Sequence, residues 1–268
     1  MIRTLKIARA EVVRTVLLTI RYPIEFFVGL GIMYSIFMGL FLGARALVQD
    51  PKVLAASLDG FVISYLMWFF VISAMNRLAF HIQMEAQMGV LEQIYLNYPN
   101  MLVLLLVRSV VDFFESLAVV IVLLLLIMVT TGRWLAISLT NLGEVLLLVA
   151  LTVAGIYGFG LIFAGLALMF KRIGQIGSIT QFAFFLLAYL PIEQTTGWLQ
   201  VALYSLPLTL GIRLLKSVVV GHESVFTEAN LALLAVLALN SAAYLLIGSL
   251  VFRLCERKSR IDGRLGQY

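Results

Sequence analysis

Charged residues, proline, histidine and cysteine are all scarce in this sequence. Only 12% of its 268 residues are charged, against about 25% in soluble domains. The single cysteine, Cys255, excludes an intramolecular disulfide. HExxH, G-x-S-x-G and the Gly-Lys dipeptide of a phosphate-binding loop do not occur, so neither a hydrolase nor an ATPase motif can be recognised. We therefore assign no catalytic residue to this chain.

Apolar residues are abundant instead. They make up 62% of the chain, and the mean hydropathy is +1.06. Because a span needs about 20 mostly apolar residues, the sequence predicts an all-α integral membrane protein with six transmembrane helices. The six predicted spans are Ile24–Gly43, Phe61–Phe80, Met101–Thr130, Leu142–Phe170, Ile176–Leu190 and Leu231–Phe252.

A seventh apolar stretch, Gly197–Gly221, is interrupted by Pro207 and contains Arg213 and Lys216. We expect it to form re-entrant helices, because a broken backbone is tolerated in a membrane only where protein covers it. These helices would belong to an extracytoplasmic region at residues 191–230. His222 falls in that region and His81 on the opposite side, which makes a shared metal site implausible.

The basic residues indicate the orientation. Six spans put both termini on one side, and both ends are basic. All Lys and Arg fall in segments expected on the inner side except Arg45, Lys52, Arg133, Arg213 and Lys216. The positive-inside rule therefore predicts a multi-pass protein of the inner (plasma) membrane with both termini in the cytoplasm. A basic tail at 253–268 would be cytoplasmic, and this distribution favours lipid over nucleic acid as the basic residues' partner.

Residues 1–22 precede the first span and have the pattern of an interfacial helix. Leu5, Ala8, Val12 and Val16 share one face, whereas the arginines lie elsewhere. Pro23 predicts a bend before the chain enters the bilayer. Alternatively, this segment is a basic leader that only sets the topology.

A polar segment at 81–99, between the second and third spans, contains "EAQMGVLEQIYLNYP". Gly89 should divide its opening stretch into two short helical pieces, and Pro99 should end the second. In that second piece Leu91 and Ile94 share an apolar face, while Glu92 points elsewhere. With Glu85 also exposed, such a helix suits docking on a partner protein.

This segment resembles the cytoplasmic coupling segment of type-2 ABC exporter permeases, which reads approximately E-x-x-x-G-T-L-E-x-L and closes with S-P. Val90 stands where Thr is usual, and Asn97–Tyr98 precede the proline. The basic first helix, the six-span count, the broken region before the last span and the basic tail also resemble that family.

The resemblance implies a function and a partner. Two permease subunits would form the translocation path, and each would dock on a separate ABC ATPase subunit through Glu85, Gly89, Leu91, Glu92, Ile94 and Pro99. ATP and Mg²⁺ would bind to that ATPase, leaving no cofactor on this chain. The second permease copy could be identical or homologous, and the transported substrate stays open.

Three charges in the third span, Arg108, Asp112 and Glu115, lie on one helical face. Intramembrane charges point to function, here a translocation path. They could also form a snorkelling group at the inner mouth, with Arg108 paired to Asp112 one turn away.

Two other function classes remain open. A stand-alone secondary transporter or channel would use Asp112 and Glu115 as ion-coupling groups, although it should show matched broken helices in its two halves. A membrane scaffold would recruit a cytoplasmic protein through the polar segment without transport.

Overall fold

The structure is a computed structural model and describes residues 2–47, 51–98, 100–135, 137, 140–170, 173–190, 192 and 195–262. Side chains 2–7, 47, 51–57 and 92 also fall outside the description. Pro99, the Glu92 side chain and residues 263–268 of the predicted tail are therefore not covered.

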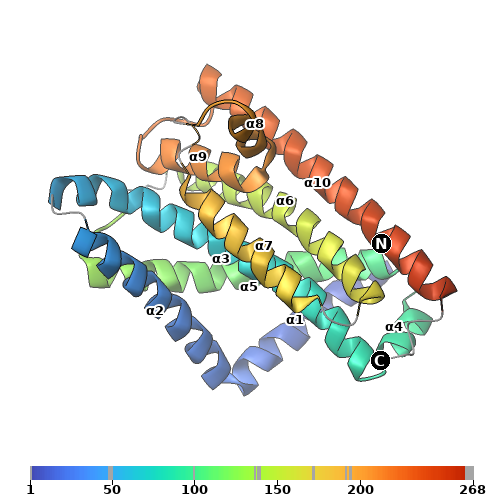
Figure 1. The fold of residues 1–268 in the computed structure, drawn as a ribbon. Helices are drawn as coiled ribbons and strands as arrows, with labels where there is room; N and C mark the ends of the chain where they lie inside the picture. The colour runs from blue at the N-terminus through green and yellow to red at the C-terminus, as the bar shows by residue number, and fades with distance from the viewer. Residues whose placement is uncertain are drawn as a thin grey trace.

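Every regular element in the described ranges is helical, as the sequence predicts (Figure 1). The helices are α1 (Ile2–Arg21), α2 (Pro23–Leu47), α3 (Pro51–Gln87), α4 (Leu91–Asn97), α5 (Met101–Thr131), α6 (Leu142–Met169), α7 (Gly174–Tyr189), α8 (Trp198–Ser205), α9 (Pro207–Val219) and α10 (Glu228–Ile261).

Five of these helices, α2, α3, α5, α6 and α10, are long and apolar enough to cross a membrane. The pair α8 and α9 would make a sixth if it formed one span, but its two helices are bent by 82° at Leu206. The fold is that of a multi-pass membrane protein.

The predicted fifth span falls on α7, which has 16 residues and is about 24 Å long at 1.5 Å per residue. That is less than the roughly 30 Å of a bilayer core. Nevertheless, α7 runs antiparallel to α3. Its Gln181 carbonyl accepts a 3.0 Å hydrogen bond from Trp68 Nε1, and its Tyr189 ring lies 5.0 Å from that of Phe61. It therefore leads the chain back along the bundle.

The break before the last span lies at Pro207, as expected. Proline has no amide hydrogen to continue α8 but suits the first turn of α9. Thr209 Oγ1 donates to the Leu203 and Leu206 carbonyls across the break. Leu208, Leu210 and Leu214 of α9 are fully buried, so protein covers the interrupted backbone.

The bundle has two ends. At one end, the turn between α3 and α4 lies near the end of α10 (Figure 1), and Ser259 Oγ of α10 donates a 3.0 Å hydrogen bond to the Leu168 carbonyl of α6. We call this the elbow end. At the other, Glu144 of α6 accepts hydrogen bonds from Ser224 Oγ (2.9 Å) and Val225 N (2.8 Å) in the loop before α10. We call this the loop end.

The first two helices form a V beside this bundle (Figure 1). The chain bends between Arg21 and Pro23, where the sequence predicts it. The face of α1 that turns inward is largely polar, because Ala8, Glu11, Thr15 and Thr19 are half-buried. The apolar face predicted from Val12 and Val16 is exposed.

Candidate functional site

The elbow between α3 and α4 depends on Gly89. Its φ of 68° is left-handed, a region in which glycine bears no Cβ penalty. The Gly89 amide donates to the Ala86 carbonyl (3.1 Å) and the Val90 amide to the Glu85 carbonyl (3.0 Å), which is the Schellman pattern of a helix end. The predicted break at Gly89 is present. However, the piece before it is the end of the 37-residue α3 and not a separate short helix.

The apolar face of α4 does not point away from the protein, contrary to expectation. Leu91 is fully buried, and Ile94 and Tyr95 pack against the hydrophobic core. The most exposed apolar side chains of the elbow are Met88 and Leu96, with exposed fractions of 61% and 86%, and Val90 between them is less exposed. A partner that binds the elbow would therefore contact Met88 and Leu96, whereas Leu91 and Ile94 anchor the helix.

Glu85 is also not the exposed docking carboxylate that the sequence suggested. It is buried, and Arg108 binds both of its oxygens, Oε1 from Nη2 at 2.8 Å and Oε2 from Nη1 at 3.2 Å. A bidentate pair of this kind fixes geometry as well as charge. Glu85 thus ties the end of α3 to the start of α5.

A second contact ties α4 to α10. The Arg260 guanidinium lies 4.5 Å from the centre of the Tyr95 ring, within the range of a cation–π interaction. Glu256 holds Arg260 with a 2.7 Å ion pair. Burial raises the pKa of the Tyr95 hydroxyl, so this side chain stays neutral. The elbow is therefore attached to α3, α5 and α10 together.

About two helical turns before Glu85, Arg77 of α3 binds two carboxylates of α5. It binds both oxygens of Glu115, one of them through Nη2 at 2.8 Å. Its Nη1 also donates to Asp112 Oδ1 at 3.4 Å. Asp112 is buried, and its second oxygen, Oδ2, has no hydrogen-bond partner among the described residues.

Arg108 does not pair with Asp112, although the two are one turn apart on α5. Besides Glu85, it binds Glu11 of α1 through Nε at 2.9 Å. Arg14 of α1 adds a 3.5 Å ion pair to Glu11. The predicted local pair is thus replaced by contacts between helices, which hold α1 on the bundle.

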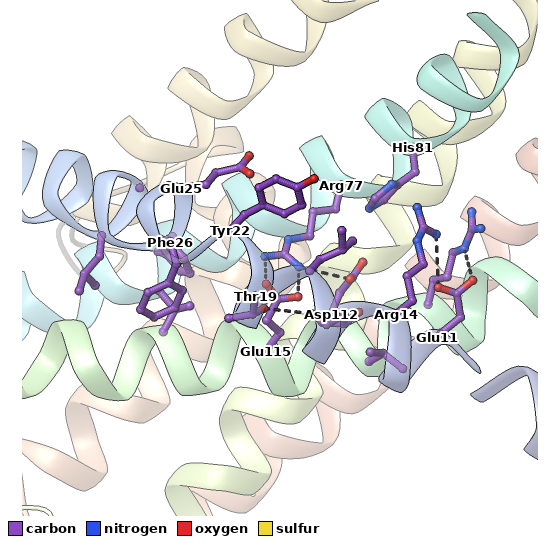
Figure 2. Close-up of a pocket in the computed structure, with 18 of the residues that line it drawn as sticks. Glu11, Arg14, Thr19, Tyr22, Glu25, Phe26, Arg77, His81, Asp112 and Glu115 are labelled. Carbon is purple, nitrogen blue, oxygen red and sulfur yellow. Dashed lines mark hydrogen bonds and ion pairs between the residues drawn. The ribbon is translucent and has the colours of Figure 1, made fainter. Parts of the chain in front are cut away.

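These groups surround a cavity of about 450 Å³ between α1, α2, α3 and α5 (Figure 2). Figure 2 shows Asp112 and Glu115 facing Arg77, with Tyr22 and Glu25 beside them. The three charges singled out in the third span, Arg108, Asp112 and Glu115, all line this cavity.

Sequence reasoning missed most of the other members of this site, among them Glu11, Arg77 and His81, which also line the cavity. The sequence did contain a feature that indicates a role for Arg77. A cation within an apolar span needs an anionic partner, and Asp112 and Glu115 are the carboxylates of a neighbouring predicted span. Nothing local to Glu11 indicated a partner 97 positions away.

The described residues contain no group of three or more His, Cys, Asp or Glu that could hold a metal ion. His81 lines the cavity, whereas His222 is an exposed loop residue at the opposite end. The structure therefore does not bring the two histidines together.

Compared with models of known protein families and with curated proteins, the chain shows no match to either.

Proposed function

We propose that this chain is the membrane-spanning permease subunit of an ATP-driven exporter of the type-2 ABC class, working as a dimer with a separate ATPase subunit. One observation carries this proposal: the elbow, whose short helix α4 (Leu91–Asn97) is fixed to the bundle by the buried Leu91, presents Met88 of the turn and Leu96 of α4 to solvent. A short helix that is anchored in the core and also exposed to a partner can be displaced by that partner and can move the spans to which it is attached.

The contacts that attach α4 to the bundle would allow a movement of α4 to be transmitted to the spans. Leu91 inserts into the core, the bidentate Glu85–Arg108 pair joins α3 to α5, and Arg260 of α10 lies over Tyr95. A displacement of α4 by ATPase closure would therefore move three spans together. ATP and Mg²⁺ would be held by the ATPase.

In this proposal α2, α3, α5, α6, α7 and α10 cross the plasma membrane, and α8 and α9 are re-entrant on the outer side. The elbow end, with α1 at the interface and both termini, faces the cytoplasm. The second permease copy would approach α2, where a Cβ added to Gly39 or Gly43 would have no described atom from another part of the chain within 4 Å; small residues there permit close helix packing.

The experiment co-expresses the permease with an ABC ATPase encoded beside its gene, where one is found, and measures co-purification and ATP hydrolysis. Met88→Glu and Leu96→Glu should each lower the bound ATPase about tenfold, because a charge enters an apolar contact. Glu92→Lys should release it too, as the resemblance predicts. Phe226→Glu, at an exposed residue of the loop end, is the matched control.

Retention of the ATPase by all three elbow variants, at the level of Phe226→Glu, would contradict the coupling role. So would the absence of an ATPase gene beside this one.

The unpartnered Asp112 oxygen favours one alternative, a stand-alone transporter coupled to ions. Purified permease without any ATPase would then transport in proteoliposomes, driven by an ion gradient. The exporter proposal expects transport only with the ATPase and ATP.

A further inference from the structure

The cavity between α1, α2, α3 and α5 has the size of a small-molecule site. Its volume of about 450 Å³ falls within the roughly 300–1,000 Å³ typical of ligand pockets. It opens beside the α1–α2 bend, where Tyr22 and Glu25 are exposed. A molecule could therefore reach it from that bend.

The cations that line the cavity are already engaged by carboxylates. Arg108 uses Nε for Glu11 and both Nη atoms for Glu85. Arg77 holds both oxygens of Glu115 and one of Asp112. Arg14, the most exposed of the three, is paired with Glu11. An anionic ligand would have to displace one of these internal pairs.

The charged side chains of the lining that keep an acceptor oxygen without a partner among the described residues are carboxylates. Asp112 has an exposed fraction of 6%, and its Oδ2 accepts no hydrogen bond from a described residue. A buried, unsatisfied carboxylate oxygen is costly, so a bound donor would stabilise it. At the mouth, the Glu25 carboxylate makes no ion pair with the described part of the chain. Both vacant acceptors favour a cationic ligand.

The remaining walls are apolar and aromatic. Phe26, Leu30 and Phe69 line the cavity with Tyr22, and Figure 2 shows the Phe26 and Tyr22 rings on the side of Glu25. Aromatic faces beside carboxylates attract ammonium groups, and the leucine and phenylalanine side chains suit a hydrocarbon body. A ligand that matches both the carboxylates and the apolar walls of the cavity is amphiphilic.

We propose that this cavity binds a protonated amine with an apolar body, whose ammonium pairs with the Asp112 carboxylate and whose body lies against Tyr22, Phe26 and Phe69. The site belongs to one subunit and needs no ATPase, so it goes beyond the exporter proposal. If the exporter proposal failed, the binding described below would be unaffected.

The test uses purified permease in a neutral detergent, with octylamine as the probe and octanol and octanoate as matched neutral and anionic compounds. Isothermal titration calorimetry measures each affinity. Octylamine should bind saturably, and the other two should bind at least about tenfold more weakly, since only an ammonium makes a charge-assisted hydrogen bond to Asp112.

Asp112→Asn should weaken octylamine binding by about tenfold or more. Glu25→Gln, at an exposed residue that can change without disturbing the core, should weaken it several-fold. Glu228→Gln, an exposed carboxylate at the start of α10, should bind like the unchanged protein.

Equal affinity for octylamine and octanol would overturn the proposal. If Asp112→Asn does not fold, Glu25→Gln decides: octylamine affinity equal to that of Glu228→Gln would also overturn it.

The amine could come from a free amphiphile or from a lipid headgroup. Octylamine affinity is therefore compared in nanodiscs of phosphatidylcholine and of phosphatidylethanolamine, which have the same net charge. Lower apparent affinity in the second would support the site and identify the ethanolamine headgroup as an occupant. Equal affinity, with binding still lost in Asp112→Asn, would support a site for free amines.

Discussion

The seam between α6 and α10 and the arm formed by α1 and α2 are held to this molecule in opposite ways. In the seam, backbones touch: a Cβ added to Gly158 would lie 2.4 Å from the Tyr244 carbonyl oxygen, and one added to Gly248 would lie 2.1 Å from that of Gly158. In the arm, a Cβ added to Gly39 would meet no described atom outside its own helix within 4 Å. The α1 part of the arm is attached by charge at Glu11, and the α2 part by one fully buried ring, Phe37, which packs against Tyr65 of α3. Close backbone packing fixes α6 against α10, whereas the ion pair that holds α1 can be replaced by an ion pair with another charged group.

The largest effect should follow from breaking the charge that holds the arm. Arg108→Met leaves Glu85 and Glu11 without their buried partner and should lower the free energy of unfolding by about 3–5 kcal/mol. Thermal unfolding in detergent measures the loss, with hydrogen exchange to locate it. We expect faster exchange in α1 first. A change confined to α6 and α10 would contradict the comparison.

A smaller effect, of opposite sign in the two regions, should follow from single methyl groups. Gly158→Ala should destabilise by about 1–3 kcal/mol, because overpacking against backbone cannot be relieved by a side-chain shift. Gly39→Ala, in the interior of α2, should be neutral or stabilise by up to about 1 kcal/mol, since alanine favours helix over glycine. Melting temperatures of the two variants in the same detergent compare them directly. Equal destabilisation would mean that α2 is packed more closely than the structure has it.

The smallest effect concerns the end of the seam at the elbow. Arg260→Gln removes the cation over Tyr95 and should cost about 0.5–1 kcal/mol of local stability. Limited proteolysis should then cut between α3 and α4 sooner, with the global melting temperature nearly unchanged. Lys258→Gln, at an exposed lysine of the same last turn, is the control and should be cut at the original rate.

The sequence predicts best what is decided within a few residues. The breaks at Tyr22–Pro23, at Gly89 and at Pro207 were all foreseen, because each depends on the backbone limits of one residue. Apolar runs of sufficient length likewise indicated α2, α3, α5, α6 and α10.

What depends on distant partners was predicted poorly. Leu91 and Ile94 share a face, but their periodicity is the same whether that face meets a partner or the chain's own core. Arg108 has Asp112 one turn away, yet binds Glu85 and Glu11, 23 and 97 positions away. A local spacing rule cannot rank such alternatives, because only the packing of α1 and α3 decides which carboxylate is close.

The length of α3 has a thermodynamic consequence. The helix is unbroken from Arg77, in the cavity wall, to Glu85, beside the elbow, a separation of about 12 Å at 1.5 Å per residue. If a protein bound at the elbow changes the cavity's affinity for an amine by some factor, the amine must change the elbow's affinity for that protein by the same factor. Measuring either affinity in the presence and absence of the other ligand would therefore give the coupling free energy between the two sites.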